Sequence, residues 1–155
     1  MKSFVICFFM LFCVLSYSQE KTIDSLKNVL NHTKNDIDKA ELLNAIASEY
    51  MSSDPKQMRE YANKALELSK KIKYRIEEGN ACLSLGNVNV ILGNYSLALD
   101  NFSNAQEIFE ADLVTDLKNS SKIKNGLARA YGSIGIVFSE QSNYAKALQY
   151  HLKAV

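Results

Sequence analysis

Apolar side chains recur every three or four residues from Lys21 to the end of the chain, with polar side chains between them. This spacing places the apolar residues on one face of a helix. The successive stripes are Ile23, Leu26 and Leu30; Ile37, Ala40, Leu43, Ala47 and Tyr50; Met58, Ala62, Leu66 and Ile72; Cys82, Leu85, Gly86 and Leu92; Tyr95, Ala98, Phe102, Ala105 and Phe109; Leu127, Tyr131, Ile134 and Phe138; and Tyr144, Ala147, Leu148 and His151. The pattern predicts an all-α protein of about seven helices.

Short polar segments separate the stripes. Asp54-Pro55 predicts a helix start, because aspartate caps free backbone N–H groups and proline fits the first helical position. Gly93-Asn94 and Ser142-Asn143 are each expected to end one helix and cap the next. Loops this short join neighbouring helices as antiparallel hairpins.

A repeat becomes visible when the chain is compared with itself at an offset of 49 residues. Leu85-Gly86 aligns with Ile134-Gly135, and Asn94-Tyr95 aligns with Asn143-Tyr144. The aligned pairs also include Ala98 with Ala147, Phe102 with His151, and Ala105 with Ala154. A weaker copy, with Ala47 at the glycine position and Ala62 in its second helix, comes earlier. The helical pair is therefore a repeating unit.

These positions resemble the tetratricopeptide repeat (TPR), a helix–turn–helix unit of about 34 residues. The resemblance implies an α-solenoid of antiparallel hairpins, with an N-terminal helix over 19–38 and three TPR-like units within 39–155. The units are expected at about 40–73, 79–113 and 120–155, the last truncated or uncapped. The offset exceeds the family period, so we expect the fifth and sixth helices to be lengthened by about two turns each.

Small residues are expected to let the paired helices approach closely. A glycine inside a helix costs about 1 kcal/mol relative to alanine. We expect Gly86 and Gly135 to face Ala98 and Ala147, where the close packing of two backbones offsets this penalty. The proposed repeat-packing positions are Ala47, Ala62, Gly86, Ala98, Phe102, Ala105, Gly135, Ala147 and Ala154.

The resemblance also implies a concave groove lined by the first helix of each unit, which in this family binds a peptide or a partner helix. The corresponding positions are Glu41, Asn44, Ser48, Met51, Asn80, Leu83, Asn87, Val90, Ile91, Arg129, Gly132, Ile136, Ser139 and Glu140. Chaperone-binding members hold a terminal carboxylate with lysines and asparagines. Here only Asn87 matches, and Leu83 stands where a lysine is needed. A mixed polar and aliphatic groove instead favours a peptide held by apolar contacts and backbone hydrogen bonds.

The opening residues have a different composition. Lys2 precedes twelve apolar residues, Phe4 to Leu15, and small residues at Ser16 and Ser18 flank Tyr17. This is the pattern of a signal peptide over 1–18. The alternative is an uncleaved anchor, but twelve helical residues reach only about 18 Å, whereas a bilayer span needs about twenty residues. We therefore expect export, to the periplasm or outside the cell, with a membrane tether if the full chain is longer.

Charge and chemistry narrow the function. The formal net charge of +1 comes from interleaved signs, with no basic stripe for nucleic acid. Glu77 and Glu78 fit a solvated face or a first helical turn. His32 and His151 lack metal-ligand spacing, and Gly79, Gly86 and Gly93 do not cluster as a phosphate loop does. We predict no catalytic residue, no cofactor, no metal site and no membrane span after residue 18.

Cys82 lies on an apolar stripe and is expected to be a buried thiol rather than a nucleophile. The primary hypothesis is a non-catalytic protein-interaction scaffold outside the cytoplasm. The segment from Lys21 to Tyr50 also resembles the exported N-terminal TPR region of sensor and regulator proteins from Bacteroidetes-type bacteria. The alternative is therefore the sensory input region of a larger signalling protein, a histidine kinase or transcriptional regulator, whose effector part is absent. An enzyme within these residues ranks third.

Overall fold

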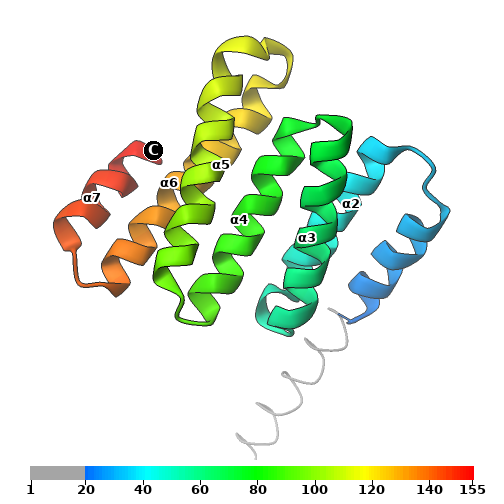
Figure 1. Ribbon diagram of the computed structural model, residues 1–155, viewed down its shortest axis with the longest axis horizontal. Helices are drawn as coiled ribbons and strands as arrows, with labels where there is room; N and C mark the ends of the chain where they lie inside the picture. The colour runs from blue at the N-terminus through cyan, green and yellow to red at the C-terminus, as the bar shows by residue number, and fades with distance from the viewer. Residues whose placement is uncertain (1–19) are drawn as a thin grey trace, which may run out of the picture.

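The computed structural model describes residues 20–155, and every regular element in that range is a helix (Figure 1). A first helix covers 20–32. It is followed by α2 (Asp36–Glu49), α3 (Pro55–Ile72), α4 (Arg75–Ile91), α5 (Tyr95–Thr115), α6 (Ser120–Glu140) and α7 (Tyr144–Lys153), with 3-10 turns at η1 (Tyr50–Ser52) and η2 (Leu117–Asn119). The all-α prediction of about seven helices is confirmed. The expected signal peptide, 1–18, lies outside the described residues.

The first helix boundary differs from the expected one. The N-terminal helix predicted for 19–38 ends at residue 32, and α2 begins at Asp36. The break arises because Asn35 adopts an extended backbone and its side chain accepts the backbone N–H of Ile37 at 2.9 Å. An asparagine cap of this kind starts a new helix. The first hairpin therefore begins before residue 40.

At the other predicted helix starts, Asp54 and Asn143 cap with their side chains, whereas Asn94 occupies the cap position without a side-chain hydrogen bond. The Asp54 carboxylate accepts the backbone N–H groups of Lys56 and Gln57, and Pro55 occupies the first turn of α3. Gly93 and Ser142 occupy the same place in two successive hairpins, and both have positive φ angles, 73° and 59°. A left-handed residue reverses the chain within a short loop. Two hairpins therefore turn in the same way with different residues.

The hairpins stack side by side. Each helix packs against the next, and the first helices of neighbouring hairpins also touch, α2 against α4 and α4 against α6. Figure 1 shows the series running from the first helix (20–32), beside α2 and α3, at one end to α7 at the other. The main core cluster lies between α4, α5 and α6, and a smaller one joins α2, α3 and α4. This is the architecture of an α-solenoid.

Gly86 and Gly135 each make room for a ring on the paired helix, which corrects the expected contact with alanine. A Cβ atom on Gly86 would lie 2.3 Å from Cε1 of Phe102, and one on Gly135 would lie 2.7 Å from Cε1 of His151. The closest approach is therefore between a helix backbone and an aromatic side chain, rather than between two backbones. The aligned pair Phe102 and His151 occupies equivalent slots.

A second glycine arrangement had no counterpart in the sequence predictions. Gly79 on α4 and Gly126 on α6 both face the ring of Phe109, and an added Cβ would lie 2.6 Å and 2.4 Å from its Cζ atom. Phe109 is fully buried between the two helices. Gly79 and Gly126 therefore make room for the Phe109 ring. Of the three glycines spaced seven residues apart, Gly79 and Gly86 each face a phenylalanine ring, and Gly93 forms a turn.

The neighbouring helices α5 and α6, from successive hairpins, are both elongated. Both helices have 21 residues, against 17 in α4 and 10 in α7. Their joined end projects beyond the ends of α3 and α4 in Figure 1. The expected lengthening of the fifth and sixth helices is therefore confirmed, and it accounts for the 49-residue offset of the repeat.

Most proposed packing positions lie in the interior. Ala47, Ala62, Ala98 and Ala105 are fully buried and Ala147 nearly so, whereas Ala154 follows α7 and is half-buried. Cys82 is 6% exposed, and burial, the largest effect, raises the pKa of its thiol to about 11. The thiol is therefore protonated at neutral pH and behaves as a small apolar side chain in the core.

Candidate functional site

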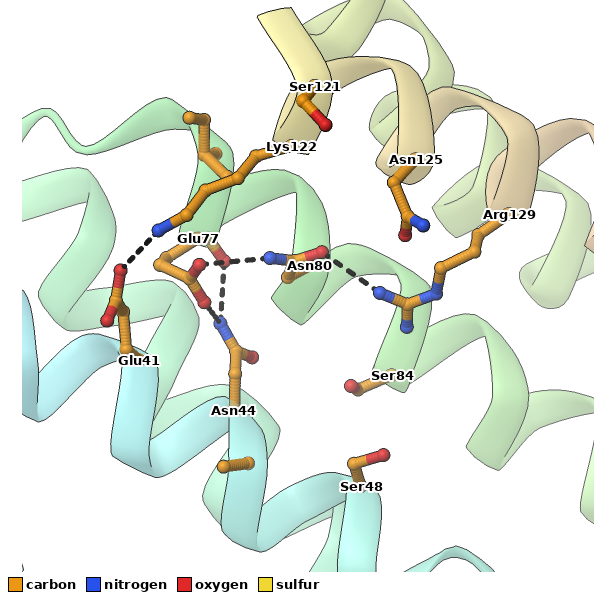
Figure 2. Close-up of a pocket in the computed structure, with 12 residues that line it drawn as sticks. Glu41, Asn44, Ser48, Glu77, Asn80, Ser84, Ser121, Lys122, Asn125 and Arg129 are labelled. Carbon is orange, nitrogen blue, oxygen red and sulfur yellow. Dashed lines mark hydrogen bonds and ion pairs between the residues drawn. The ribbon is translucent and has the colours of Figure 1, made fainter. Parts of the chain in front are cut away.

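The first helices of the three hairpins share one face, which we call the α2–α4–α6 face. Two hollows lie on it. A polar pocket of about 500 Å³ is lined by Glu41, Asn44, Ala45, Ser48, Ile76, Glu77, Asn80, Ser84, Ser121, Lys122, Asn125 and Arg129 (Figure 2). An apolar pocket of about 260 Å³ is lined by Met51, Ser52, Asn87, Val90, Ile91, Phe102, Ser133 and Ile136. The face thus offers two kinds of surface.

Glu77 is the buried acid of the polar pocket. Its side chain is 6% exposed, and its carboxylate accepts the amide N–H groups of Asn44 at 2.7 Å and Asn80 at 3.0 Å. Glu77 also lies in the first turn of α4, where the helix dipole favours a negative charge. The prediction of a first-turn position is confirmed, but the alternative of a solvated carboxylate is wrong, because α2 packs over it.

Among the described residues, the side-chain amide of Asn44 has hydrogen-bond partners for its nitrogen but not for its oxygen. Its Nδ2 atom donates to the backbone oxygen of Glu77 at 2.9 Å and to the Glu77 carboxylate. Both neighbours are acceptors, so the amide nitrogen must face them. The Oδ1 atom is buried and has no hydrogen-bond partner within residues 20–155. A buried acceptor without a donor costs about 1–3 kcal/mol.

The opposite wall of the polar pocket comes from α6. Arg129 donates from its guanidinium to Oδ1 of Asn80 at 3.2 Å, and burial lowers the pKa of Arg129. Lys122 forms an ion pair with Glu41 at 3.1 Å, and this hydrogen bond raises the pKa of Lys122. Both partners of that pair are more than 40% exposed, so the pair contributes less than about 1 kcal/mol to stability.

Tyr74, the residue before α4, contacts the rim residue Glu41. Its hydroxyl donates to Glu41 at 3.0 Å, and its pKa is raised, mainly by burial and then by this hydrogen bond. Glu41 therefore receives one hydrogen bond from Tyr74 and one from Lys122, which orient its carboxylate at the rim. The only titratable groups that line the pocket are carboxylates, a lysine and an arginine. Such a set can bind polar groups but lacks a histidine or thiol nucleophile.

Most predicted groove residues lie on this face. Glu41, Asn44, Ser48, Asn80 and Arg129 line the polar pocket, and Met51, Asn87, Val90, Ile91 and Ile136 line the apolar one. Leu83 does not: it is 1% exposed and packs in the core between α4, α5 and α6, so its assignment to the groove was wrong. Gly132, Ser139 and Glu140 line neither of these two pockets.

Several residues of the polar pocket were not among the predicted groove positions. Glu77 precedes Asn80 by three positions, and Lys122 and Asn125 precede Arg129 by seven and four, so all share faces with predicted residues. Their spacing along α4 and α6 is therefore the sequence signal that identifies them.

Across the part of the chain that the structure describes, no group of three or more His, Cys, Asp or Glu side chains is placed to hold a metal ion. Among the helices between residues 20 and 155, none combines the length and apolar character that a bilayer crossing needs.

The fold and the site define a class, an α-solenoid of helical hairpins with a pocketed inner face. No protein-family model and no curated protein matches the chain. A solved structure described as the crystal structure of MamA is similar, with 21% identity over 90% of this chain and 88% of that chain, at a TM-score of 0.46. A similarity of this size carries no information about a partner.

Proposed function

We propose that the protein is a non-catalytic scaffold that binds a peptide segment of a partner protein on the α2–α4–α6 face. The observation that supports this most directly is the construction of the face. Each of three successive hairpins contributes residues to both pockets, so one extended ligand can contact the whole series.

The apolar pocket supports a protein partner. Met51, Ile91 and Ile136 come from three different hairpins and are 46%, 46% and 51% exposed. They meet around one hollow, with Asn87 beside them. Clustered exposed aliphatic residues with a polar neighbour are typical of surfaces that bind other proteins. Burying them against a peptide would supply the apolar part of the binding energy.

The location outside the cytoplasm is part of this proposal. It rests on the signal-peptide pattern of residues 1–18, and N-terminal sequencing of the exported protein tests it: a chain that keeps Met1 would contradict cleavage. The sensory-input alternative places the same binding face upstream of a signalling module. Reading the gene beyond codon 155 tests that alternative.

A peptide-display experiment tests the proposed binding face. A library of random twelve-residue peptides is selected against the chain, and the affinities of enriched peptides are then measured by fluorescence anisotropy. We expect Ile91→Glu to weaken binding by about tenfold or more, because it places a charge in the apolar pocket.

Leu148→Glu is the matched control, because Leu148 is similarly exposed but lies on α7 and lines neither pocket. It should leave the affinity unchanged. Enriched peptides that bind Ile91→Glu as tightly as the unmodified chain would contradict the proposed face. Failure of any peptide to enrich would contradict peptide binding itself.

A further inference from the structure

We propose, on the basis of the proposed function, that the polar pocket receives a lysine or arginine side chain of the bound peptide, with Asn44 and Glu77 as its acceptors. The apolar pocket then receives an aliphatic side chain about three peptide residues away. The inference names the chemical class of the ligand, which the proposed function leaves open.

The first argument is the unsatisfied oxygen of Asn44. Asn44 is 8% exposed, and its amide nitrogen is engaged by Glu77, so its Oδ1 atom is directed to the other side. In Figure 2 this oxygen points toward Ser84, another residue of the pocket lining. A donor from a ligand would remove the free-energy cost of this unsatisfied acceptor. Ammonium and guanidinium groups supply only donors, so they match it.

The second argument is charge. The Glu77 carboxylate is buried, and its direct side-chain partners are the neutral amides of Asn44 and Asn80. Glu41 has its own partner in Lys122. The guanidinium of Arg129 bonds to Asn80 and does not reach Glu77 directly. A ligand cation would therefore give Glu77 its first direct charge partner, and Arg129 keeps further N–H groups for a peptide carbonyl oxygen.

The same geometry disfavours a ligand carboxylate in this position. A carboxylate beside Asn44 would bring two acceptors together and would lie next to Glu77, a like charge in a buried setting. Lys122 is already paired with Glu41 at the rim. The pocket therefore differs in its preference from a surface built to hold an acidic chain end.

The third argument is the regular spacing of the two pockets. Asn44, Asn80 and Arg129 line the polar pocket, and the residues seven positions later, Met51, Asn87 and Ile136, line the apolar one. Seven helical residues correspond to about 10.5 Å along a helix. An extended peptide covers this distance in about three residues. The ligand pattern is therefore a basic residue and an aliphatic residue three positions apart.

The test uses a display library in which each peptide carries one fixed leucine and random residues around it. Lysine and arginine should be enriched about tenfold at a position three residues from the leucine, because a buried charge-assisted hydrogen bond discriminates by about that factor. With Glu77→Gln as the target the enrichment should disappear. Glu78→Gln is the matched control, since Glu78 is the next residue of α4 but lines a different pocket; the enrichment should remain.

A second measurement needs no variant and stays decisive if Glu77→Gln fails to fold. Three synthetic peptides that differ only at the tested position, with lysine, glutamine or glutamate, are titrated against the unmodified chain. Affinity should fall in that order. Equal affinities, or a preference for glutamate, with leucine still required would overturn the cationic subsite and leave the proposed function standing. Loss of all binding, leucine-dependent binding included, would contradict both.

Discussion

The second hairpin, α4 with α5, and the third hairpin, α6 with α7, contain the same slot with different contents. In the second hairpin, Gly86 accommodates Phe102, whose ring is 1% exposed. In the third, Gly135 accommodates His151, which is exposed. The slot itself is equivalent, because each glycine lies against ring atoms at less than 3 Å from an added Cβ. What differs is how tightly the ring is held.

The two rings differ in burial because α5 and α7 differ in the number of helices that pack against them. α5 packs against both α4 and α6, so Phe102 belongs to the main core cluster. α7 packs against α6, and its outward residues Tyr144 and Leu148 are well exposed within the described chain. A slot of fixed geometry therefore contributes different amounts of stability, depending on whether another helix covers the ring. Pairs of variants at aligned positions can test this.

The largest difference is expected when each ring is removed. Phe102→Ala should lower the free energy of unfolding by about 3–5 kcal/mol, because a buried ring is lost and a cavity remains. His151→Ala should lower it by less than about 1 kcal/mol, since the ring is already exposed. Urea unfolding followed by circular dichroism at 222 nm measures both. Losses of similar size would contradict the role assigned to burial.

An intermediate difference is expected when the slots are filled. Gly86→Ala places a Cβ atom against a ring that is buried among α4, α5 and α6, and should destabilise the fold by about 1–3 kcal/mol. Gly135→Ala meets a ring that can turn into solvent, so the better helix propensity of alanine, up to about 1 kcal/mol, should make it neutral or stabilising. Thermal unfolding of the two single variants measures the contrast. A stable Gly86→Ala protein would show that the Phe102 slot is looser than the structure indicates.

The smallest effects are expected at the two turns. Gly93→Ala should cost about 1 kcal/mol, because φ is +73° and no atom within 4 Å of the added Cβ can compensate. Ser142→Gly, at the aligned position with φ of 59°, should instead stabilise by about 0.5 kcal/mol or slightly more. Urea midpoints of the two variants should therefore move in opposite directions. Movement in the same direction would contradict the equivalence of the turns.

The repeat pattern singled out Gly86 and Gly135 but not the aromatic rings that lie nearest to them. Gly86 and Gly135 were recognised because they break the helical pattern at a regular offset. Their partners could not be inferred in the same way, because Ala98 and Phe102 lie one turn apart on the same face of α5. Which of them meets the glycine depends on the crossing of the two helices, which is a property of the packed pair.

In the candidate site, too, the sequence predicts which residues share a face, whereas helix packing decides which of them meet. The repeat resemblance placed Asn44, Asn80 and Arg129 on one face, and the structure brings all three to one pocket. The resemblance placed Leu83 there too, although it is buried in the core. For Glu77, the sequence allowed either a solvated carboxylate or a position in the first turn of a helix. The hydrogen bond between Asn44 and Glu77 joins residues 33 positions apart, so it depends on how α2 and α4 pack.

Local chemistry, readable along the chain, determined the helices, most of their ends, the hairpin repeat and the lengthening of α5 and α6. Periodicity and capping act over a few residues, and such short-range effects are encoded directly in the order of side chains. Only the tertiary structure decided which rings fill the glycine slots, which carboxylate is buried and which oxygen lacks a donor. Those outcomes depend on distances between helices, and many small packing energies must be balanced together before any one of them is determined.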